Sequence, residues 1–130
     1  MAAMSDFLEN AILNATLNAT TYTSPAAVYI GLFTSDPTDA GSGTEVSGGS
    51  YARKAGTFTT ASGTGGSVST NAAVEFDQAT ASWGTITHFG LFDAVSTGNL
   101  LYHGAFTASK AIDTGDILKV ASGDITVTLA

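Results

Sequence analysis

The sequence predicts a mainly β protein, an antiparallel β-sandwich of six to eight short strands with one N-terminal α-helix. Three observations predict it: apolar residues alternate with period two in several segments, turn formers separate those segments, and helical spacing occurs only near the N-terminus. Because no helices lie between the strands, a parallel α/β architecture is excluded. The length of 130 residues is typical of one domain. We expect a single domain over 1–130, with the helix at about 6–18 and the sandwich at about 27–130.

The expected helix has recognisable start signals. Ser5 or Asp6 can serve as the N-cap, and Asp6 with Glu9 has the spacing of a capping box. Both carboxylates also lie near the positive end of the helix dipole. One face carries apolar residues at helical spacing, namely Leu8, Ala11, Ile12 and Ala15. This face is expected to pack on the sandwich.

A second apolar patch on the same helix consists of Leu13 and Leu17. These residues are four apart and share one face, beside a row of asparagines at Asn10, Asn14 and Asn18. A wide core-facing stripe is the commoner explanation of such a pattern. The alternative is that the helix lies between its own sheet and a neighbouring subunit.

Seven segments after the helix are expected as strands: 27–34, 51–60, 68–76, 83–93, 100–107, 117–121 and 124–129. The turn formers at 95–99 and at Ser122-Gly123 predict two hairpins. The period-two alternation is clearest in 68–76 and 124–129. It predicts six inward-pointing side chains: Val68, Val74, Phe76, Ile125, Val127 and Leu129.

Residues 35–50, SDPTDAGSGTEVSGGS, predict a long loop because turn formers dominate them. Asp36, Asp39 and Glu45 could supply oxygen ligands to calcium, but their spacing is not that of an EF-hand, so a solvated acidic loop is the favoured interpretation. The glycines allow another chain to approach closely. We therefore predict a homo-oligomer interface formed by the helix and this loop, with Leu13, Leu17, Asp36, Pro37, Asp39 and Glu45 as contact residues.

Charge and composition argue against several partners. The net charge is −7, and Arg53 and Lys54 are the only adjacent cations, so a nucleic-acid partner is not expected. No apolar run approaches the roughly 18 residues of a membrane span, so no membrane partner is expected either. The chain has no cysteine, so neither disulfides nor thiolate metal sites contribute to the fold.

Known catalytic patterns are missing from the sequence. It contains neither a GxSxG elbow nor the Gly-Lys-Ser/Thr ending of a P-loop. His88 and His103 with Asp93 make a two-His-one-carboxylate site conceivable, although packing within the sheet is the favoured interpretation. The aromatic residues could form a sugar-binding platform, but strand aromatics are more often core: Trp83, Phe89, Phe92, Tyr102 and Phe106. We expect no enzyme activity, no cofactor, and no catalytic, cofactor-binding or metal-binding residue.

Four stretches of the sequence carry a family resemblance: SDFLENAILN, SPAAVYIGLFTSDPTDAGSGTEVSGGSYAR, ATASWGTITHFGLFDAVSTGNLLYHGAFT and the ending SGDITVTL. With them the chain resembles a family of short phage and prophage proteins that are generally called phage tail fibre proteins. The resemblance covers nearly the whole chain from Met4 onward and is weakest at 57–70. It implies a structural role in the virion and no active site.

The resemblance also implies a location, which is the phage particle after synthesis in the host bacterial cytoplasm. A short chain without an elongated repeat fits a capsid decoration (cement) protein or a head-spike base that binds the major capsid shell, and this is the predicted function. The alternative is a tail fibre or host receptor-recognition module. The expected partners are other copies of the chain, the major capsid protein and other virion proteins. By analogy with decoration proteins at three-fold positions, the expected homo-oligomer is a trimer.

Overall fold

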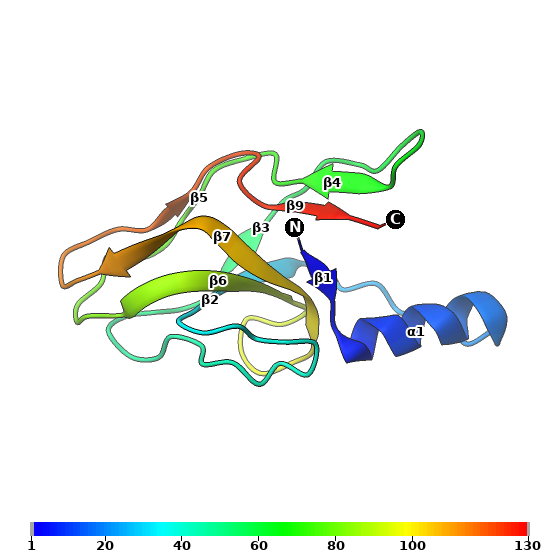
Figure 1. The fold of residues 1–130 in the computed structure, drawn as a ribbon, viewed down its shortest axis with the longest axis horizontal. Coiled ribbons are helices and arrows are strands. Elements are labelled where there is room, and N and C mark those ends of the chain that lie inside the picture. Colours follow the sequence, from blue (N-terminus) through cyan, green and yellow to red (C-terminus); the bar gives the residue numbers. More distant parts are fainter. Residues whose placement is uncertain (1, 130) are drawn as a thin grey trace.

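A computed structural model describes residues 2–129, which form one helix and nine strands (Figure 1). Strands account for 36% of the chain and helix for 9%. All the strand pairs are antiparallel, so the predicted fold class is confirmed. The strands outnumber the expected six to eight because six of the nine have only two or three residues. Alternation cannot be recognised over so short a stretch.

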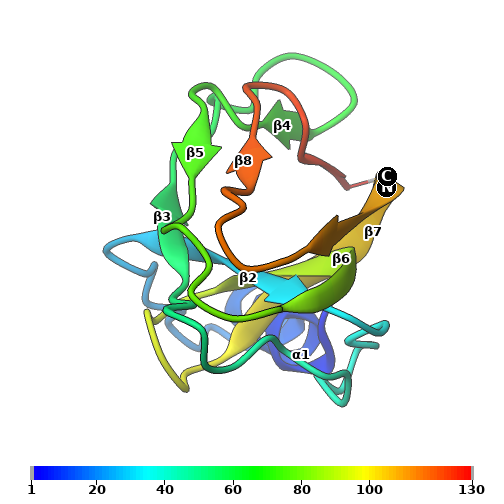
Figure 2. The same ribbon diagram turned by 90° about the vertical axis from the view of Figure 1, so that its left-hand side faces the viewer.

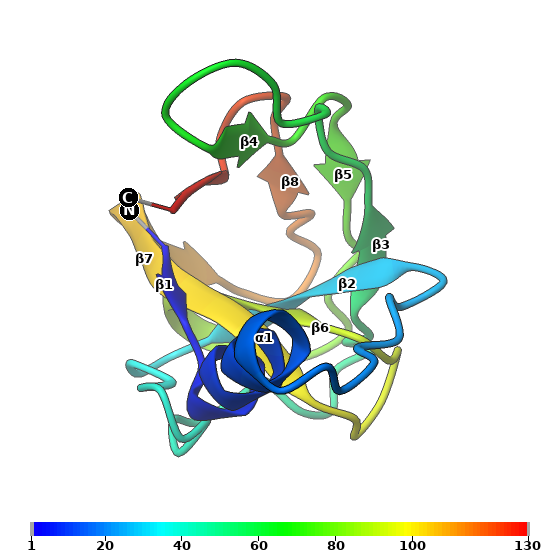
Figure 3. The same ribbon diagram turned by 90° about the vertical axis from the view of Figure 1, so that its right-hand side faces the viewer.

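Five strands form the main sheet in the order β1-β7-β6-β2-β3. Their bounds are Ala3–Met4 for β1, Leu100–Ile112 for β7, Gly84–Phe92 for β6, Val28–Phe33 for β2 and Lys54–Gly56 for β3. Two small sheets pair β4 (Ser67–Ser69) with β9 (Thr126–Thr128), and β5 (Val74–Glu75) with β8 (Lys119–Val120). Figures 2 and 3 show the small sheets standing across from the main sheet.

The hydrophobic core fills the space between these two layers. The main sheet contributes Ile30, Leu32, Ile86, Phe89 and Leu91, and the opposite layer contributes Val74, Phe76, Val120, Ile125 and Val127. Each large side chain of this kind contributes about 1.5–3 kcal/mol when it is removed from water. The two layers are therefore held together mainly by burial of apolar surface.

The inward-pointing residues predicted from alternation are correct except at the C-terminal end. Val74, Phe76, Ile125 and Val127 are buried, and Val68 is partly buried against the core. Leu129 is 47% exposed, so its prediction was wrong. It lies one residue beyond β9, where its amide donates to the Gly66 carbonyl (2.9 Å) and no second layer covers its side chain.

Strand β7 is longer than predicted because it contains a bulge. Its register with β6 passes from His88↔Ala105 to Ile86↔Lys110, so residues 106–109 stand opposite the single residue Thr87. A bulge interrupts the alternation of faces along a strand. For this reason the period-two pattern ends at 107, whereas the strand continues to Ile112.

Helix α1 spans Asp6–Leu17, one residue shorter than expected. Ser5 is the N-cap, and its Oγ accepts a hydrogen bond from the Leu8 amide (3.2 Å). Asp6 is therefore the first helical residue, and the predicted capping box of Asp6 with Glu9 does not form. Within residues 2–129, no helix is long and apolar enough to cross a lipid bilayer.

A buried hydroxyl links the C-terminal turn to the body. Thr70 Oγ1 accepts from the amides of Gly123 (3.0 Å) and Ile125 (3.4 Å) and donates to the Ala121 carbonyl (3.3 Å). We expect Thr70→Val, which keeps the side-chain volume, to lower the free energy of unfolding by about 1–3 kcal/mol, because the buried Ile125 amide loses its acceptor and the hydroxyl's other two hydrogen bonds are lost. Urea unfolding measures the loss. The exposed control Thr126→Val should change stability by less than about 0.5 kcal/mol.

Candidate functional site

Helix α1 is attached to the sheet mainly by its first turn. The Ser5 amide donates to the Leu101 carbonyl of β7 (2.9 Å), and the Asp6 amide donates to the Asp39 carbonyl (3.0 Å). Leu8 is the one fully buried residue of the helix. Figure 1 shows the later turns of α1 projecting beyond one end of the β body, and Figure 3 views the helix nearly end-on. The later turns therefore present a face to solvent.

That face carries the two leucines predicted as an interface. Leu13 is 55% exposed and Leu17 is 75% exposed, and the helical period places both opposite the buried Leu8. The core-facing stripe expected at 8, 11, 12 and 15 is the half-buried or buried side of the helix. Leu13 and Leu17 are therefore not part of a wider core-facing stripe.

The loop at 35–50 does not hold its acidic residues in one cluster. Asp36 and Asp39 lie beside His103 of β7: Asp39 Oδ1 is 2.8 Å from Nε2, and Asp36 Oδ1 is 3.7 Å from Nδ1. Pro37 lies between these two residues in the sequence and is fully buried, so its side chain offers no surface to another chain. Glu45 lies against Arg53 instead. The loop is thus fastened to the sheet at both ends.

Glu45 and Arg53 form a partly buried ion pair with two parallel hydrogen bonds. Arg53 Nε and Nη2 donate to the two carboxylate oxygens of Glu45 at 2.8 Å each. Arg53 Nη1 donates to the carbonyls of Ala94 (3.0 Å) and Thr97 (2.8 Å), and its guanidinium carbon lies 3.5 Å from the centre of the Phe92 ring. This cation therefore joins the long loop to the β6–β7 turn.

The structural role of Arg53 was missed by the sequence interpretation, which considered it only as half of a cationic pair with Lys54. Its neighbour Tyr51 donates to Glu45 Oε2 (2.7 Å) and accepts from the Leu32 amide (2.9 Å). One signal was available: Arg53 is the single arginine of a weakly charged chain. Arginine favours bidentate pairing with a carboxylate, and Glu45 is the nearest acidic residue in sequence.

The residues considered for a two-His-one-carboxylate site have separate partners. His88 Nδ1 lies 2.8 Å from Thr87 Oγ1, and His103 contacts the long loop as described above. Asp93 accepts from the backbone and side-chain amides of Asn99 (2.7 and 2.9 Å) and closes the β6–β7 turn. Among residues 2–129, no group of three or more His, Cys, Asp or Glu side chains is arranged to hold a metal ion.

The strand aromatics divide into core residues and surface residues. Trp83, Phe89 and Phe92 are buried, which supports the core interpretation for these three. Tyr102 and Phe106 are only partly buried and pack on the core from outside. A sugar-binding platform made of all five rings is therefore not present.

A comparison with known protein families finds a match over most of the chain. A family model described as "Podophage GP4 fiber I protein gp80" matches residues 3–128, which include the helix and all nine strands of the described chain. The chain belongs to this family. The resemblance to phage tail fibre proteins is therefore confirmed. No curated protein matches the chain in sequence.

Membership of the gp80 fibre family gives the function at a coarse level. The chain is a phage fibre-type protein, which agrees with the tail-fibre alternative and makes it a virion component. Among the large hydrophobic side chains that the structure leaves exposed, Leu13 and Leu17 share the outer face of α1.

Replacing the single arginine tests the junction between the loop and the β6–β7 turn. We expect Arg53→Lys to lower the free energy of unfolding by about 2 kcal/mol, because an ammonium cannot form the bidentate pair or cover the Phe92 ring in the same way. Denaturant unfolding measures this. The control Lys54→Met removes the exposed pair with Asp77 (2.9 Å) and should cost less than about 0.5 kcal/mol. Equal effects of the two changes would contradict the assigned role.

The Tyr51 phenol predicts a loss of stability at alkaline pH. Burial, and then its hydrogen bond to Glu45, raise the pKa of Tyr51 well above the ordinary value of 10.0. The phenol therefore ionises at lower pH in the unfolded chain than in the folded chain. Below pH 10.0 this difference does not affect the free energy of unfolding. Above pH 10.0 ionisation favours the unfolded chain, so the free energy of unfolding falls as pH rises. We expect the thermal midpoint to fall above pH 10.0, and to fall less steeply in Tyr51→Phe than in the control Tyr29→Phe. Equal slopes would contradict the prediction.

Proposed function

We propose that this chain is a non-catalytic structural subunit of a phage fibre and assembles with copies of itself through helix α1. The observation that carries the proposal is the exposure of Leu13 and Leu17 on the outer face of that helix. Neighbouring exposed leucines on one face of a helix that is anchored mainly by its first turn favour contact with another protein surface. Membership of the fibre family supports a repeated assembly.

The distribution of charge favours another copy of the chain as the partner. The net charge of −7 makes identical copies repel one another over most of their surface. No charged residue lies between Glu9 and Asp36, so all of α1 beyond its first turn is uncharged. Two copies can therefore approach through this helix without placing like charges in contact. A closed cyclic trimer would satisfy every copy of the same surface without open-ended growth.

Capsid decoration is the second candidate function, with the major capsid protein as the partner. It is favoured by the compact two-layered β body that residues 2–129 form. Imaging of the particle distinguishes the two. Copies confined to fibres at the tail support the fibre subunit, whereas many copies spread over the head support decoration.

Aspartate substitutions on α1 test the assembly. We expect Leu13→Asp combined with Leu17→Asp to convert the oligomer to a monomer, since two charges would be placed in an apolar contact. Sedimentation velocity and circular dichroism measure mass and fold, and the β signal should remain. Val95→Asp changes a residue of similar exposure (53%) in the β6–β7 turn and should leave assembly unchanged. A monomeric wild-type chain, both free and released from particles, would refute the proposal.

A further inference from the structure

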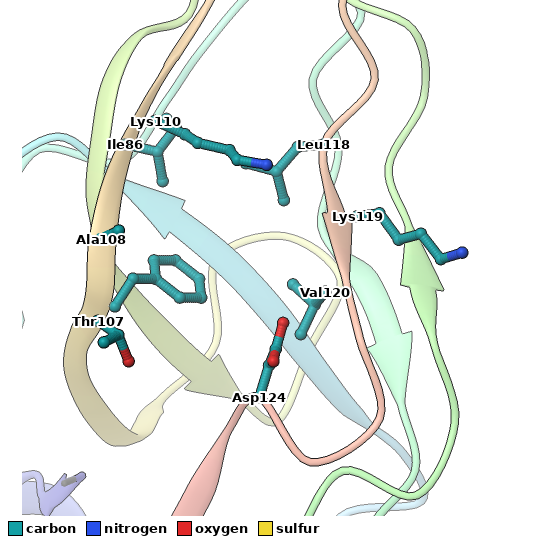
Figure 4. A pocket seen from close by; sticks show the side chains of 9 residues that line it. Ile86, Thr107, Ala108, Lys110, Leu118, Lys119, Val120 and Asp124 are labelled. Atoms are coloured by element: carbon teal, nitrogen blue, oxygen red, sulfur yellow. The ribbon is translucent and has the colours of Figure 1, made fainter.

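A cleft of about 200 Å³ opens between strand β7 and the segment that contains β8 (Figure 4). The two strands are not hydrogen-bonded to each other, since β7 pairs with β6 and β1 while β8 pairs with β5. Apolar side chains form much of the lining: Ile86, Phe106, Leu118 and Val120. Figures 1 and 3 place this part of the molecule away from helix α1. The cleft is therefore separate from the proposed assembly surface.

The bulge in β7 shapes one wall of this cleft. Phe106, Thr107 and Ala108 belong to the run that stands opposite the single residue Thr87, and all three line the cleft. Extra residues in a strand redirect its side chains and recur beside binding sites. Phe106 is half-buried and lies 5.3 Å from Phe89, measured between ring centres, so its position is supported from the core.

The cleft also holds a cation that the fold does not use. Of four cations in the chain, Arg53 pairs with Glu45 and Lys54 pairs with Asp77. Within residues 2–129, Lys110 and Lys119 form no ion pair. Figure 4 shows the Lys110 chain reaching across the cleft toward Leu118, whereas the Lys119 chain points away from it. In a chain of net charge −7, this ammonium is the local attraction for an anion.

The other end of the cleft provides hydrogen-bond acceptors. Asp124 Oδ2 accepts from the Ala121 amide (2.9 Å), which fixes the carboxylate and leaves Oδ1 able to accept from a ligand. Figure 4 places Asp124 at the end of the cleft opposite Lys110, with the Thr107 hydroxyl at the same end. The cleft thus has a cation at one end, an acceptor at the other and an apolar wall between them.

We propose that this cleft binds a sugar acid, a pyranose ring that carries a carboxylate. The carboxylate would pair with Lys110, a ring hydroxyl would donate to Asp124, and the C–H face of the ring would lie on the apolar wall. A space of about 200 Å³ admits a single pyranose and excludes a drug-sized molecule. The chemistry matches because a sugar acid has an anionic group, hydroxyl donors and an apolar face in one small ring.

An inserted peptide strand fits these observations less well. Strand addition needs a regular edge with evenly alternating backbone groups. The edge of β7 that borders the cleft is the bulged part, where the alternation of faces is interrupted. The irregular wall and the single ammonium favour a compact anionic ligand.

Titration of the full chain with D-glucuronic acid tests the proposal. Chemical-shift perturbation in NMR should show binding with a Kd of about 1 mM, as expected for a ligand of this size. D-glucose, which lacks the carboxylate, should bind at least about fivefold more weakly, and so should D-glucuronic acid to Lys110→Gln, because each loses a charge-assisted hydrogen bond. Lys119→Gln removes the same charge beside the cleft and should leave binding within about twofold of wild type.

Three results would overturn the assignment. They are equal binding of glucuronate and glucose, glucuronate binding that Lys110→Gln does not weaken, and preferential binding of L-leucine, whose ammonium would replace the hydroxyl at Asp124. Lys110 is exposed, and its variant should keep the wild-type melting midpoint, so loss of binding can be separated from loss of fold. The Leu13→Asp and Leu17→Asp chain should still bind glucuronate. Failure of assembly and failure of the cleft are therefore distinguishable.

Discussion

The guanidinium of Arg53 joins two parts of the chain that are distant from each other in sequence. Glu45 brings the 35–50 loop to it, the carbonyls of Ala94 and Thr97 bring the β6–β7 turn, and the Phe92 ring lies beneath it. Removing such a pair from water costs free energy that good geometry and further hydrogen bonds must offset. Here four donated hydrogen bonds and an aromatic face do so. The pair thereby links the 35–50 loop to the β6–β7 turn.

The position of helix α1 depends on the loop that Arg53 fastens. The Asp39 carbonyl receives the Asp6 amide at the start of the helix, and the Asp39 carboxylate contacts His103 on β7. Ser5 Oγ donates to the Leu100 carbonyl on the same strand. The first turn is thus held by the loop and by β7 together. The later turns are left with an outer face that no described part of the chain covers.

Local patterns in the sequence predicted the elements that local chemistry decides. The helix, its core-facing side and most of the inward residues of 68–76 and 124–129 follow from periodicity, because a single face must be buried along each element. The pairing of Glu45 with Arg53, and of Asp39 with His103, depends on which segments meet across the fold. Grouping the acidic residues Asp36, Asp39 and Glu45 by their nearness in sequence therefore assigned them one role, whereas the structure gives them two. The bulge in β7 was not predicted for the same reason, because extra residues in one strand can be recognised only from its pairing with the neighbouring strand.

The bulge and the helix place two different surfaces at opposite ends of one small body. A fibre subunit must be joined to the particle and to its neighbours while another surface stays accessible, so separation of the two is a geometric requirement. The uncharged outer face of α1 suits permanent contact, because it offers apolar area and no like-charge repulsion. The cleft beside β7 suits a small polar ligand, because its apolar wall is limited in size and lies between groups of opposite charge. The main sheet connects the two, because β7 accepts a hydrogen bond from the N-cap Ser5 at Leu101 and lines the cleft at Lys110. A single strand thus sets the distance between the proposed assembly face and the proposed binding cleft.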